Sequence, residues 1–456
     1  MDFKHAIETS LRPLAEDIAA LCRINSVGTE AEPGYPCGRG TAEALQAALD
    51  LGTKFGFKSE NFDNVVGHID FGDGEEILGI LGHVDVVPAG DGWDTDPWGG
   101  IITEDRIIGR GTLDDKGPVL TCLYAMKILK EMQVPLKKKV RVILGTDEET
   151  SWKCVHHYLE QVKPQLPTMA FSPDSQFPLT YAEKGLLQFW LTKEMSEVIE
   201  VEGGGAFNSV PSIAKITLDG SFAEAVAAAV AASEEKDAYV VEEKDGKVVL
   251  TANGVIAHAA YLEKGKNAIS LMMQIVAKLP VTGELKAFSD FYQDCFGTCI
   301  HGENMGVYCE DEDCGPISLN VSNIKFEDGK LVIGCDSRIP VSFTIESIEE
   351  KVAAKVAGHG YSYTQRSTSE PLYVSKESEL VKTLMAAYSK VTGDYESQPE
   401  TSGGATYSRA IDNCVAFGCL LPGQEDTMHQ ANEYLKLDDL KVWLEIMVEA
   451  IYQLAK

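Results

Sequence analysis

The densest group of potential metal ligands lies in the first third of the chain. His83 and Asp85 follow a short apolar run two residues apart, so their side chains point to the same side of an extended segment. His83 can bind a metal ion through one ring nitrogen, and Asp85 can lie beside it or orient the ring from behind. Asp114 and Asp115 follow at a predicted strand-to-helix turn, where one carboxylate can cap the helix while the other binds a metal. These residues indicate chemistry that depends on a divalent ion.

Three more carboxylates and a second histidine extend this set: Glu148, Glu149, Asp174 and His429. Two imidazoles and three carboxylates suit two divalent ions with one bridging carboxylate, most naturally zinc. Of two adjacent glutamates, one can bind metal while the other acts as a general base towards a metal-bound water. In a chain with 70 acidic residues, a lone Glu-Glu pair is more often a solvated loop, so this interpretation depends on the other ligands.

The elements that must position these residues are strands followed by helices. Residues 77–82 and 140–144 have the pattern of short buried strands, and residues 118–132 have apolar side chains at helical spacing. This βαβ pattern predicts an α/β fold with a mainly parallel central sheet and helices on both faces. In such folds ligands bind at the carboxyl ends of the strands, where the first and second of these runs carry potential metal ligands.

The middle of the chain has a different pattern. Strand-like stretches, Asp-Gly hairpin turns and alanine-rich helical stretches at 222–233 and 345–357 predict an α+β insert. We therefore expect one domain made of residues 1–180 and 381–456, and a second, inserted domain made of residues 181–380.

Composition limits the partners and the compartment. The chain of 456 residues has 40 basic and 70 acidic residues, a net charge of −30, which argues against nucleic-acid and membrane partners. No run of 18 apolar residues is present, and the N-terminus has the pattern of an acidic amphipathic helix without a secretory signal. The odd number of scattered cysteines, 11, indicates reduced thiols. We expect a cytoplasmic protein.

The ordered motifs, including GHVDVVPAGDGW, GRGTLDDKG and the closing HQANE, resemble the co-catalytic zinc peptidases that include aminoacylase, carboxypeptidase G, succinyl-diaminopimelate desuccinylase and acetylornithine deacetylase. They look most similar to the PepV-like bacterial dipeptidases of the Xaa-His dipeptidase or carnosinase type. The resemblance covers nearly the whole chain. It implies a catalytic domain with two Zn²⁺ ions, or Mn²⁺ or Co²⁺, and an inserted lid domain.

The resemblance also implies a role for each ligand. His83 and Asp174 would hold one ion, and Glu149 and His429 would hold the other. Asp114 would bridge both ions, because it matches the first aspartate of the Asp-x-Lys-Gly motif of the family.

Further roles follow from the same resemblance. Asp85 would support His83, and Glu148 would be the general base that takes a proton from a bridging water. His258 in the lid would stabilise the oxyanion of the intermediate. Four positions would bind the substrate carboxylate and backbone: Asn208, Arg338, Gly403 and Gly404. The insert of about 200 residues matches the enlarged lid of PepV-like members, which lets one chain supply the whole site, so we expect a monomer.

The predicted function is hydrolysis of short unblocked peptides, chiefly dipeptides, since an enlarged lid would exclude long substrates and Arg338 would demand a free carboxylate. Two alternatives stay open. An N-acyl amino-acid deacylase or desuccinylase would use the same metal site, and acylated substrates would distinguish it. A non-catalytic metal-binding protein would have no need for the free Glu148.

Overall fold

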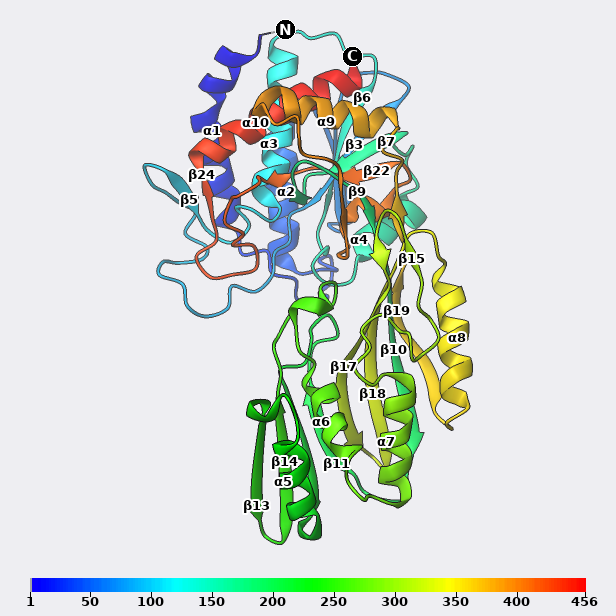
Figure 1. Ribbon diagram of the computed structural model, residues 1–456. Helices are drawn as coiled ribbons and strands as arrows, with labels where there is room; N and C mark the ends of the chain where they lie inside the picture. Colours follow the sequence, from blue (N-terminus) through cyan, green and yellow to red (C-terminus); the bar gives the residue numbers. More distant parts are fainter. Residues whose placement is uncertain (1) are drawn as a thin grey trace. The chain divides into compact units, whose positions relative to one another are not determined.

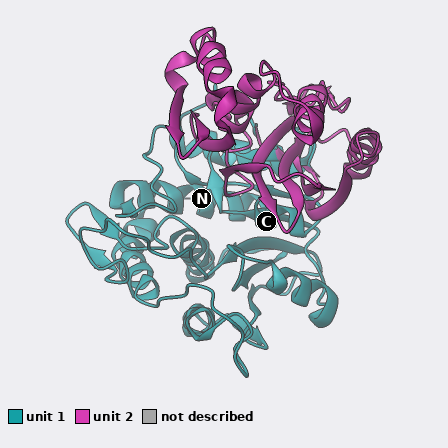
Figure 2. Ribbon diagram, turned by 90° about the horizontal axis from the view of Figure 1, so that it is seen from below, with its two compact units in different colours: residues 1–181, 373–400, 406–456 teal, residues 182–372, 401–405 magenta. Residues whose placement is uncertain are grey.

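The computed structural model describes residues 2–456, which form two compact units (Figure 2). Unit 1 contains the chain up to Tyr181 together with Tyr373–Glu400 and Thr406–Lys456, and unit 2 contains Ala182–Leu372 and Thr401–Ala405. The expected insert of residues 181–380 differs from unit 2 in that residues 373–380 belong to unit 1, whereas the short segment 401–405 joins unit 2. The catalytic and lid roles of these units remain predictions.

Unit 1 is built on a nine-stranded sheet in the order β1-β2-β6-β3-β7-β22-β9-β20, with β21 beside β9. The strands are β1 (Lys58–Phe62), β2 (Val66–Phe71), β3 (Ile77–His83), β6 (Lys139–Gly145), β7 (Met169–Ser172), β9 (Thr180–Glu183), β20 (Leu372–Tyr373), β21 (Glu400–Ser402) and β22 (Cys414–Ala416). β3 runs parallel to β6 and β7, and β22 runs parallel to β7. β1 and β2 add an antiparallel edge. The predicted α/β fold with a mainly parallel sheet is confirmed.

Six α-helices pack around this sheet in the described part of unit 1 (Figure 1). They are α1 (Lys4–Cys22), α2 (Arg39–Lys54), α3 (Lys116–Glu131), α4 (Lys153–His156), α9 (Glu379–Thr392) and α10 (Leu437–Ala455). Short elements complete the unit: β4 (Ile101–Ile102), β5 (Arg106–Ile108), β8 (Ser175–Gln176), η1 (His157–Val162), η5 (Tyr407–Ala410), β23 (Cys419–Leu420) and β24 (Tyr434–Lys436).

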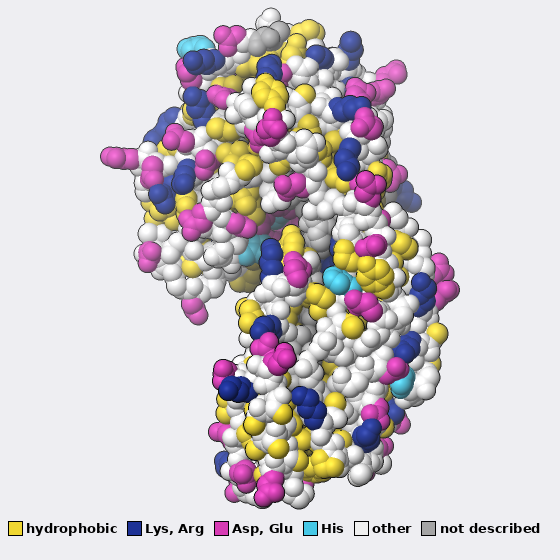
Figure 3. All heavy atoms as spheres, viewed as in Figure 1, with side chains coloured by type: hydrophobic (Ala, Val, Ile, Leu, Met, Phe, Trp, Pro, Cys, Tyr) yellow, Lys and Arg dark blue, Asp and Glu magenta, His cyan; other side chains and the backbone are white. Residues whose placement is uncertain are grey.

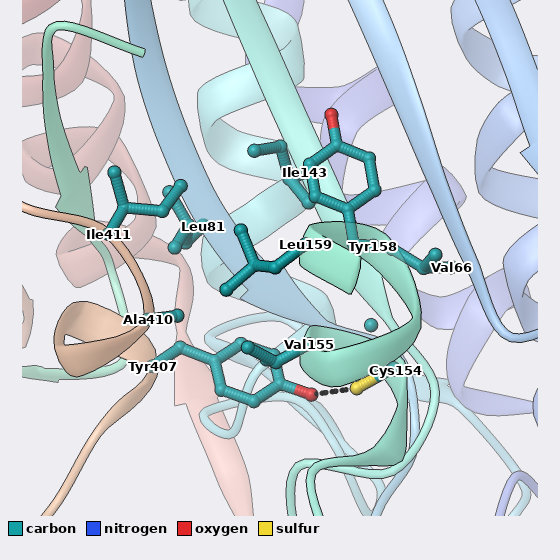
Figure 4. Close-up of a pocket in the computed structure, with 11 residues that line it drawn as sticks. Val66, Leu81, Ile143, Cys154, Val155, Tyr158, Leu159, Tyr407, Ala410 and Ile411 are labelled. Atoms are coloured by element: carbon teal, nitrogen blue, oxygen red, sulfur yellow. Dashed lines mark hydrogen bonds between the residues drawn. The ribbon is translucent and has the colours of Figure 1, made fainter. Parts of the chain in front are cut away.

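Strand β3 shows why helices cover both faces of the sheet. All seven of its residues are buried, as expected for a central parallel strand. On one face Gly82 lies so close to α3 that an added Cβ would be 2.2 Å from Val119 Cγ1. On the other face Leu81 packs with Tyr158 and its neighbours around an apolar cavity of about 20 Å³ (Figure 4). Such a volume holds about one water molecule, so this cavity is a small packing defect and not a substrate site.

Unit 2 contains an eight-stranded sheet in the order β13-β14-β12-β11-β17-β18-β10-β19, in which every paired strand is antiparallel. The strands are β10 (Gly185–Glu194), β11 (Glu200–Gly204), β12 (Ile213–Asp219), β13 (Tyr239–Lys244), β14 (Lys247–Asn253), β17 (Ser318–Glu327), β18 (Lys330–Ile339) and β19 (Ser362–Ser369). The helices are α5 (Ala223–Ala231), α6 (Ala268–Val276), α7 (Gly283–Cys295) and α8 (Ile345–Ala357). Short pieces are η2 (Gly220–Phe222), η3 (Lys236–Ala238), η4 (Leu262–Lys264), β15 (Glu310–Asp311) and β16 (Gly315–Pro316).

In unit 2 the sequence correctly predicted a hairpin at an Asp-Gly turn. Asp328 and Gly329 both have positive φ, at 51° and 74°, and connect β17 to β18 through the pair Glu327↔Lys330. This is the geometry that makes Asp-Gly favourable in two-residue hairpins. Helices α5 and α8 match the two alanine-rich stretches, whereas α6 and α7 were not predicted. Seven of the nine residues of α6 are buried, and only Ser270 and Gln274, four residues apart, mark its polar side, so the helical signal is short.

The surface carries charges of both signs. On the face seen in Figure 3, Lys and Arg side chains are scattered among Asp and Glu side chains. None of the helices within residues 2–456 combines the length and apolarity needed to cross a membrane. None of the eleven cysteines, which all lie in the described part of the chain, forms a disulfide, and nine of them are buried.

Candidate metal centre

Three neighbouring strands bring four of the predicted residues to one edge of the unit 1 sheet. His83 is the last residue of β3, the pair Glu148 and Glu149 follows β6, and Asp174 follows β7. Because β3 lies between β6 and β7 and runs parallel to both, the carboxyl ends of these strands meet. The remaining ligands come from two loops of the same unit, before α3 and before β24.

Asp114 lies between the two histidines. Its Oδ1 is 3.1 Å from His83 Nε2, and its Oδ2 is 2.7 Å from His429 Nε2. His83 Nε2 also lies 3.6 Å from Asp174 Oδ2, and His429 Nε2 lies 3.1 Å from Glu149 Oε1. The site therefore contains two imidazole–carboxylate pairs, with one oxygen of Asp114 facing each pair. This is the arrangement that a carboxylate bridging two metal ions requires.

The proton on the His83 ring shows that these residues fit a metal ion. Nδ1 of His83 lies 3.0 Å from the backbone carbonyl oxygen of Asp85, which can only accept, so Nδ1 carries a hydrogen. In the neutral ring Nε2 then has only a lone pair. This atom is buried and has no hydrogen-bond partner among the described residues, and it faces the carboxylates of Asp114 and Asp174. Burial lowers the pKa of His83, but the facing carboxylates of Asp114 and Asp174 outweigh it and hold this pKa well above its ordinary value, so the metal-free ring takes a second proton at Nε2. A divalent ion can replace that proton between the ring and the carboxylates, so the donor set fits a metal ion.

Asp85 lies on the Nδ1 side of His83, away from Nε2. Its carboxylate is 3.4 Å from His83 Nδ1 and also accepts the backbone N–H groups of Glu148 and Glu149 at 3.2 and 3.1 Å. The fully buried ring and the loop that carries the glutamate pair are thus held by one carboxylate. Such outer partners orient metal ligands and fix the tautomer of the ring.

Glu148 is close to the ligands without belonging to either pair. One ligand atom from each of His83, Glu148 and Asp174 lies within 4.8 Å of the others, and the same holds for His83, Asp114 and Glu149. Burial raises the pKa of Glu148 well above its ordinary value. A carboxylate held near a metal-ligand set in this way can accept and release protons during a reaction.

The protons at this site lead to a prediction about pH. Burial raises the pKa of Glu149 and of Asp174, and hydrogen bonds to Asp114 and Glu149 raise the pKa of His429 to about 11. The metal-free site therefore holds protons at neutral pH that a bound cation must displace. We expect metal binding to release protons and metal affinity to increase between about pH 6 and pH 8. Calorimetric titration in buffers of different ionisation enthalpy measures this release, and an affinity that falls over this range would contradict it.

Unit 2 brings the predicted lid residues together. Ala259 N donates to the carbonyl oxygen of Asn208 at 2.9 Å, and Ser209 pairs with His258 as an isolated β-bridge. In the same unit, Arg338 Nη1 donates to the carbonyl oxygen of Gly403 at 2.8 Å. An added Cβ on Gly403 would lie 2.5 Å from Ala260 Cβ, two residues after His258. The backbone N–H of Gly404 donates to Ser402 Oγ at 2.9 Å, so it already has an acceptor.

The His258 ring presents a donor. The backbone N–H of Ala260 donates to His258 Nδ1 at 3.2 Å, so this nitrogen carries the lone pair and Nε2 carries the hydrogen in the neutral ring. Burial and the positive charge of Arg338 lower the pKa of His258, which favours the neutral ring. His258 Nε2–H is therefore available to donate a hydrogen bond.

A third group of potential ligands, Asp294, Cys295 and His359, lies in unit 2. Asp294 Oδ2 is already paired with Lys355 Nζ at 2.7 Å and with His359 Nε2 at 2.8 Å. The positive charge of the Lys355 ammonium would repel a metal cation bound here, so we assign no metal to this group.

Comparison with known proteins identifies the family. The sequence profile of "Peptidase family M20/M25/M40" matches residues 79–453, more than four-fifths of the chain. This match spans both units and all the residues described above.

The chain belongs to peptidase family M20/M25/M40. It is 35% identical to the Bacillus subtilis (strain 168) protein named "Putative dipeptidase YtjP", over 97% of each chain. It is 33% identical to "Putative dipeptidase SH1171" of Staphylococcus haemolyticus, over 99% of each chain. The fold is similar to the crystal structure of aminoacylhistidine dipeptidase from Vibrio alginolyticus, with a TM-score of 0.60, 15% identity, and coverage of 97% of this chain and 96% of that one. The family resemblance that we inferred from the motifs is confirmed.

Sequence reasoning left two charged residues of this M20 chain without a role. Arg110 and Glu433 lie inside the quoted motifs, four residues from Asp114 and from His429 respectively, and form a buried ion pair with an N–O distance of 2.6 Å. Their fixed spacing from two ligands is the signal that could have identified them. Their pairing depends on contact between segments more than 300 residues apart, which no local pattern reveals.

Proposed function

We propose that this chain is a metal-dependent dipeptidase that hydrolyses short peptides with free termini, with two divalent ions bound in unit 1, most naturally Zn²⁺. The observation that carries the proposal is Asp114, whose two oxygens face two separate imidazole–carboxylate pairs at 3.1 and 2.7 Å, with Glu148 adjacent. The names of the full-length relatives support the dipeptidase class. The proposed ligands are His83 and Asp174 for one ion, Glu149 and His429 for the other, and Asp114 for both.

Divalent ions held by these residues would supply Lewis-acid chemistry for hydrolysis of the peptide bond. Glu148 accepts a proton from the attacking water and transfers it to the leaving amine. Burial raises the pKa of Glu148 well above its ordinary value, which makes its carboxylate a stronger base than an exposed glutamate. Asp85 keeps His83 and the Glu148 loop in place through the three contacts described above.

The proposed lid residues of unit 2 recognise the substrate. His258 donates its Nε2–H to the oxyanion that forms at the scissile carbonyl. Arg338 uses Nε and Nη2 on the buried carboxylate of Asp336, at 2.7 and 3.2 Å, and Nη1 on Gly403, so two of its five N–H groups remain. Asp336 thereby fixes the direction of the guanidinium, which pairs with the terminal carboxylate of the peptide. Asn208 and Gly403 complete this binding surface.

Replacing His258 by alanine should lower kcat about 10²–10³-fold, the usual cost of losing one oxyanion donor, while KM changes little. Steady-state kinetics on a good dipeptide substrate measures this. A matched control is His301→Ala, which removes another unit 2 histidine whose Nδ1 contacts the carbonyl oxygen of Ile317 at 2.7 Å. An unchanged kcat in His258→Ala, or an equal loss in both variants, would remove the proposed role.

The experiment that tests the function compares free dipeptides with N-acyl amino acids, using metal-stripped protein with and without added Zn²⁺ or Mn²⁺. Metal-restored cleavage of free dipeptides alone is the expected result. Cleavage of acylated amino acids alone would instead establish a deacylase. Metal binding without any cleavage would make this a non-catalytic metal-binding protein.

The remaining parts of the proposal concern assembly and location. The resemblance of the motifs to PepV-like dipeptidases and the size of unit 2, Ala182–Leu372 with Thr401–Ala405, support a monomer in which one chain supplies the whole site. Light scattering of the pure protein measures the mass against 49.6 kDa for one chain. Eleven cysteines without a disulfide among the described residues support a reducing, cytoplasmic location.

A further inference from the structure

Two buried charges that the proposed reaction does not use lie beside the metal ligands. The side chain of Arg110 is 1% exposed and that of Glu433 is 0% exposed, and Arg110 Nη1 lies 2.6 Å from Glu433 Oε2. Removing two charges from water is costly even when they are paired, so such a pair is weak evidence for a purely stabilising role. Its place in the chain indicates another role.

Glu433 holds the turn that leads to Asp114. Its Oε1 accepts the backbone N–H groups of Gly111 and Leu113 at 3.1 and 2.8 Å. Its carbonyl oxygen accepts the backbone N–H of Gly109 at 3.0 Å. The last of the residues bound by the carboxylate, Leu113, directly precedes Asp114, so a shift of Glu433 moves the bridging ligand.

Glu433 also fixes the end of the loop that carries His429. His429 and Asn432 have φ angles of 61° and 63°, in the left-handed region that residues with side chains rarely adopt. A loop with two such residues keeps one shape only when its ends are held. Directly after Glu433 the chain pairs with β5 through Tyr434↔Ile108, so Glu433 lies where this loop rejoins a strand.

Arg110 extends the connection to the segment after β3. Its Nη2 lies 3.4 and 3.3 Å from the carbonyl oxygens of Pro88 and Ala89, and its guanidinium lies 5.4 Å from the ring of Trp93. This segment begins with His83 and Asp85. One buried ion pair thus contacts all three loops that follow or precede His83, Asp114 and His429.

We propose that Glu433, paired with Arg110, is a positioning residue that sets the separation of Asp114 and His429 and thereby the affinity of the site for its second metal ion, the one held by Glu149 and His429. This inference rests on the proposed function, because it assumes the two-ion site. Glu433 itself has no place in the ligand set, and it acts through the backbone N–H groups before Asp114 and through the end of the His429 loop.

The test is metal binding by the full chain, measured without substrate. Metal-stripped wild type and Glu433→Gln are titrated with Zn²⁺ against a chromophoric chelator, and the visible absorption of Co²⁺ reports ligand geometry. We expect two ions in the wild type. A glutamine has one acceptor oxygen, so it cannot accept both from the Gly111 and Leu113 N–H groups and from Arg110 Nη1, and its NH₂ group must face one of these donors. In Glu433→Gln we therefore expect the first ion to bind normally and the second about 10–100-fold more weakly, with an altered Co²⁺ spectrum.

The matched control is another buried carboxylate–arginine pair of unit 1. Asp70 on β2 binds Arg141 on β6 through two contacts of 2.6 and 2.7 Å, with side chains 8% and 7% exposed, and neither residue contacts a ligand loop. Asp70→Asn should lower the melting temperature but keep both metal affinities. Normal binding of both ions by Glu433→Gln would overturn the proposal, and so would an equal loss in Asp70→Asn.

A double variant keeps the proposal testable if Glu433→Gln does not fold. Arg110→Met combined with Glu433→Met removes both charges, and with them the acceptor of the Gly111 and Leu113 N–H groups, at similar side-chain size, so no unpaired buried charge remains. The same weakening of the second ion is expected in this double variant, and wild-type affinity for both ions would overturn the proposal. A wild-type protein that binds fewer than two ions would overturn the proposed two-ion site as well, which distinguishes that failure from this one.

Discussion

Replacing Glu148 by alanine is expected to lower kcat about 10²–10⁴-fold, the range typical of a general acid–base group, while two metal ions remain bound. The reason is geometric: Glu148 offers an oxygen within 4.8 Å of ligand atoms of His83 and Asp174, yet each imidazole–carboxylate pair is complete without it. Metal content and kcat of the same preparation, measured with saturating Zn²⁺, give both quantities.

The neighbouring glutamate supplies the matched control for this prediction. Glu149 Oε1 lies 3.1 Å from His429 Nε2, so Glu149→Ala should lose metal as well as activity. Glu148→Gln keeps the shape of the side chain and should be as inactive as Glu148→Ala, because an amide cannot take the proton. A Glu148 variant with the wild-type rate would remove the general-base role, and one that loses a metal ion would make Glu148 a ligand.

The rule that ligands lie at the carboxyl ends of parallel strands predicted that His83 and the Glu148–Glu149 pair would lie at one edge of the sheet. Asp174 joins them because β7 also runs parallel to β3, which the sequence analysis did not predict. Backbone geometry enforces this whatever the intervening loops do. The same rule does not predict the order of strands in the sheet. β6 lies between β2 and β3 because it pairs with both, and these pairings join segments that are distant in the sequence.

His429 could be predicted as a ligand type but not placed by local reasoning. It reaches Asp114 from 315 residues away along the chain, through a loop whose path depends on the pairing of β24 with β5. The buried pair of Arg110 and Glu433 depends on the same contact. The sequence pattern marks these residues, but only tertiary structure gives them partners.

Local patterns also fail where a helix is buried on nearly all sides. Helix α6 (Ala268–Val276) lies in the core of unit 2, and its polar stripe consists only of Ser270 and Gln274, which is a weak signal over nine residues. The boundary between the two domains could also not be predicted completely from the order of elements along the chain. Segment 401–405, which includes Gly403, joins unit 2 through contacts such as Arg338 Nη1 with the Gly403 carbonyl oxygen, whereas chain order alone assigned it to the other domain.

Replacing Asp114 by asparagine is expected to lower the affinity for the second ion by more than the roughly 100-fold upper range for outer partners, because Asp114 faces both sites directly. An asparagine keeps one oxygen and turns an NH₂ group towards the other imidazole, either His83 or His429. With one ion lost, the peptidase activity should fall and extra Zn²⁺ should not restore kcat. Metal stoichiometry by elemental analysis, together with kinetics over a Zn²⁺ series, measures both effects.

The residue next to Asp114 is the strongest control for this prediction. Burial and the negative charge of Asp174 raise the pKa of Asp115 well above its ordinary value, which favours the neutral carboxyl group. Asp115→Asn keeps the shape of the side chain, and its oxygen can still accept the His83 backbone N–H, which lies 3.1 Å from Oδ2 in the wild type. We expect Asp115→Asn to bind two ions and Asp114→Asn to bind one. Two ions in both variants would contradict the bridging role, since the single charge that separates the two imidazoles would then be dispensable.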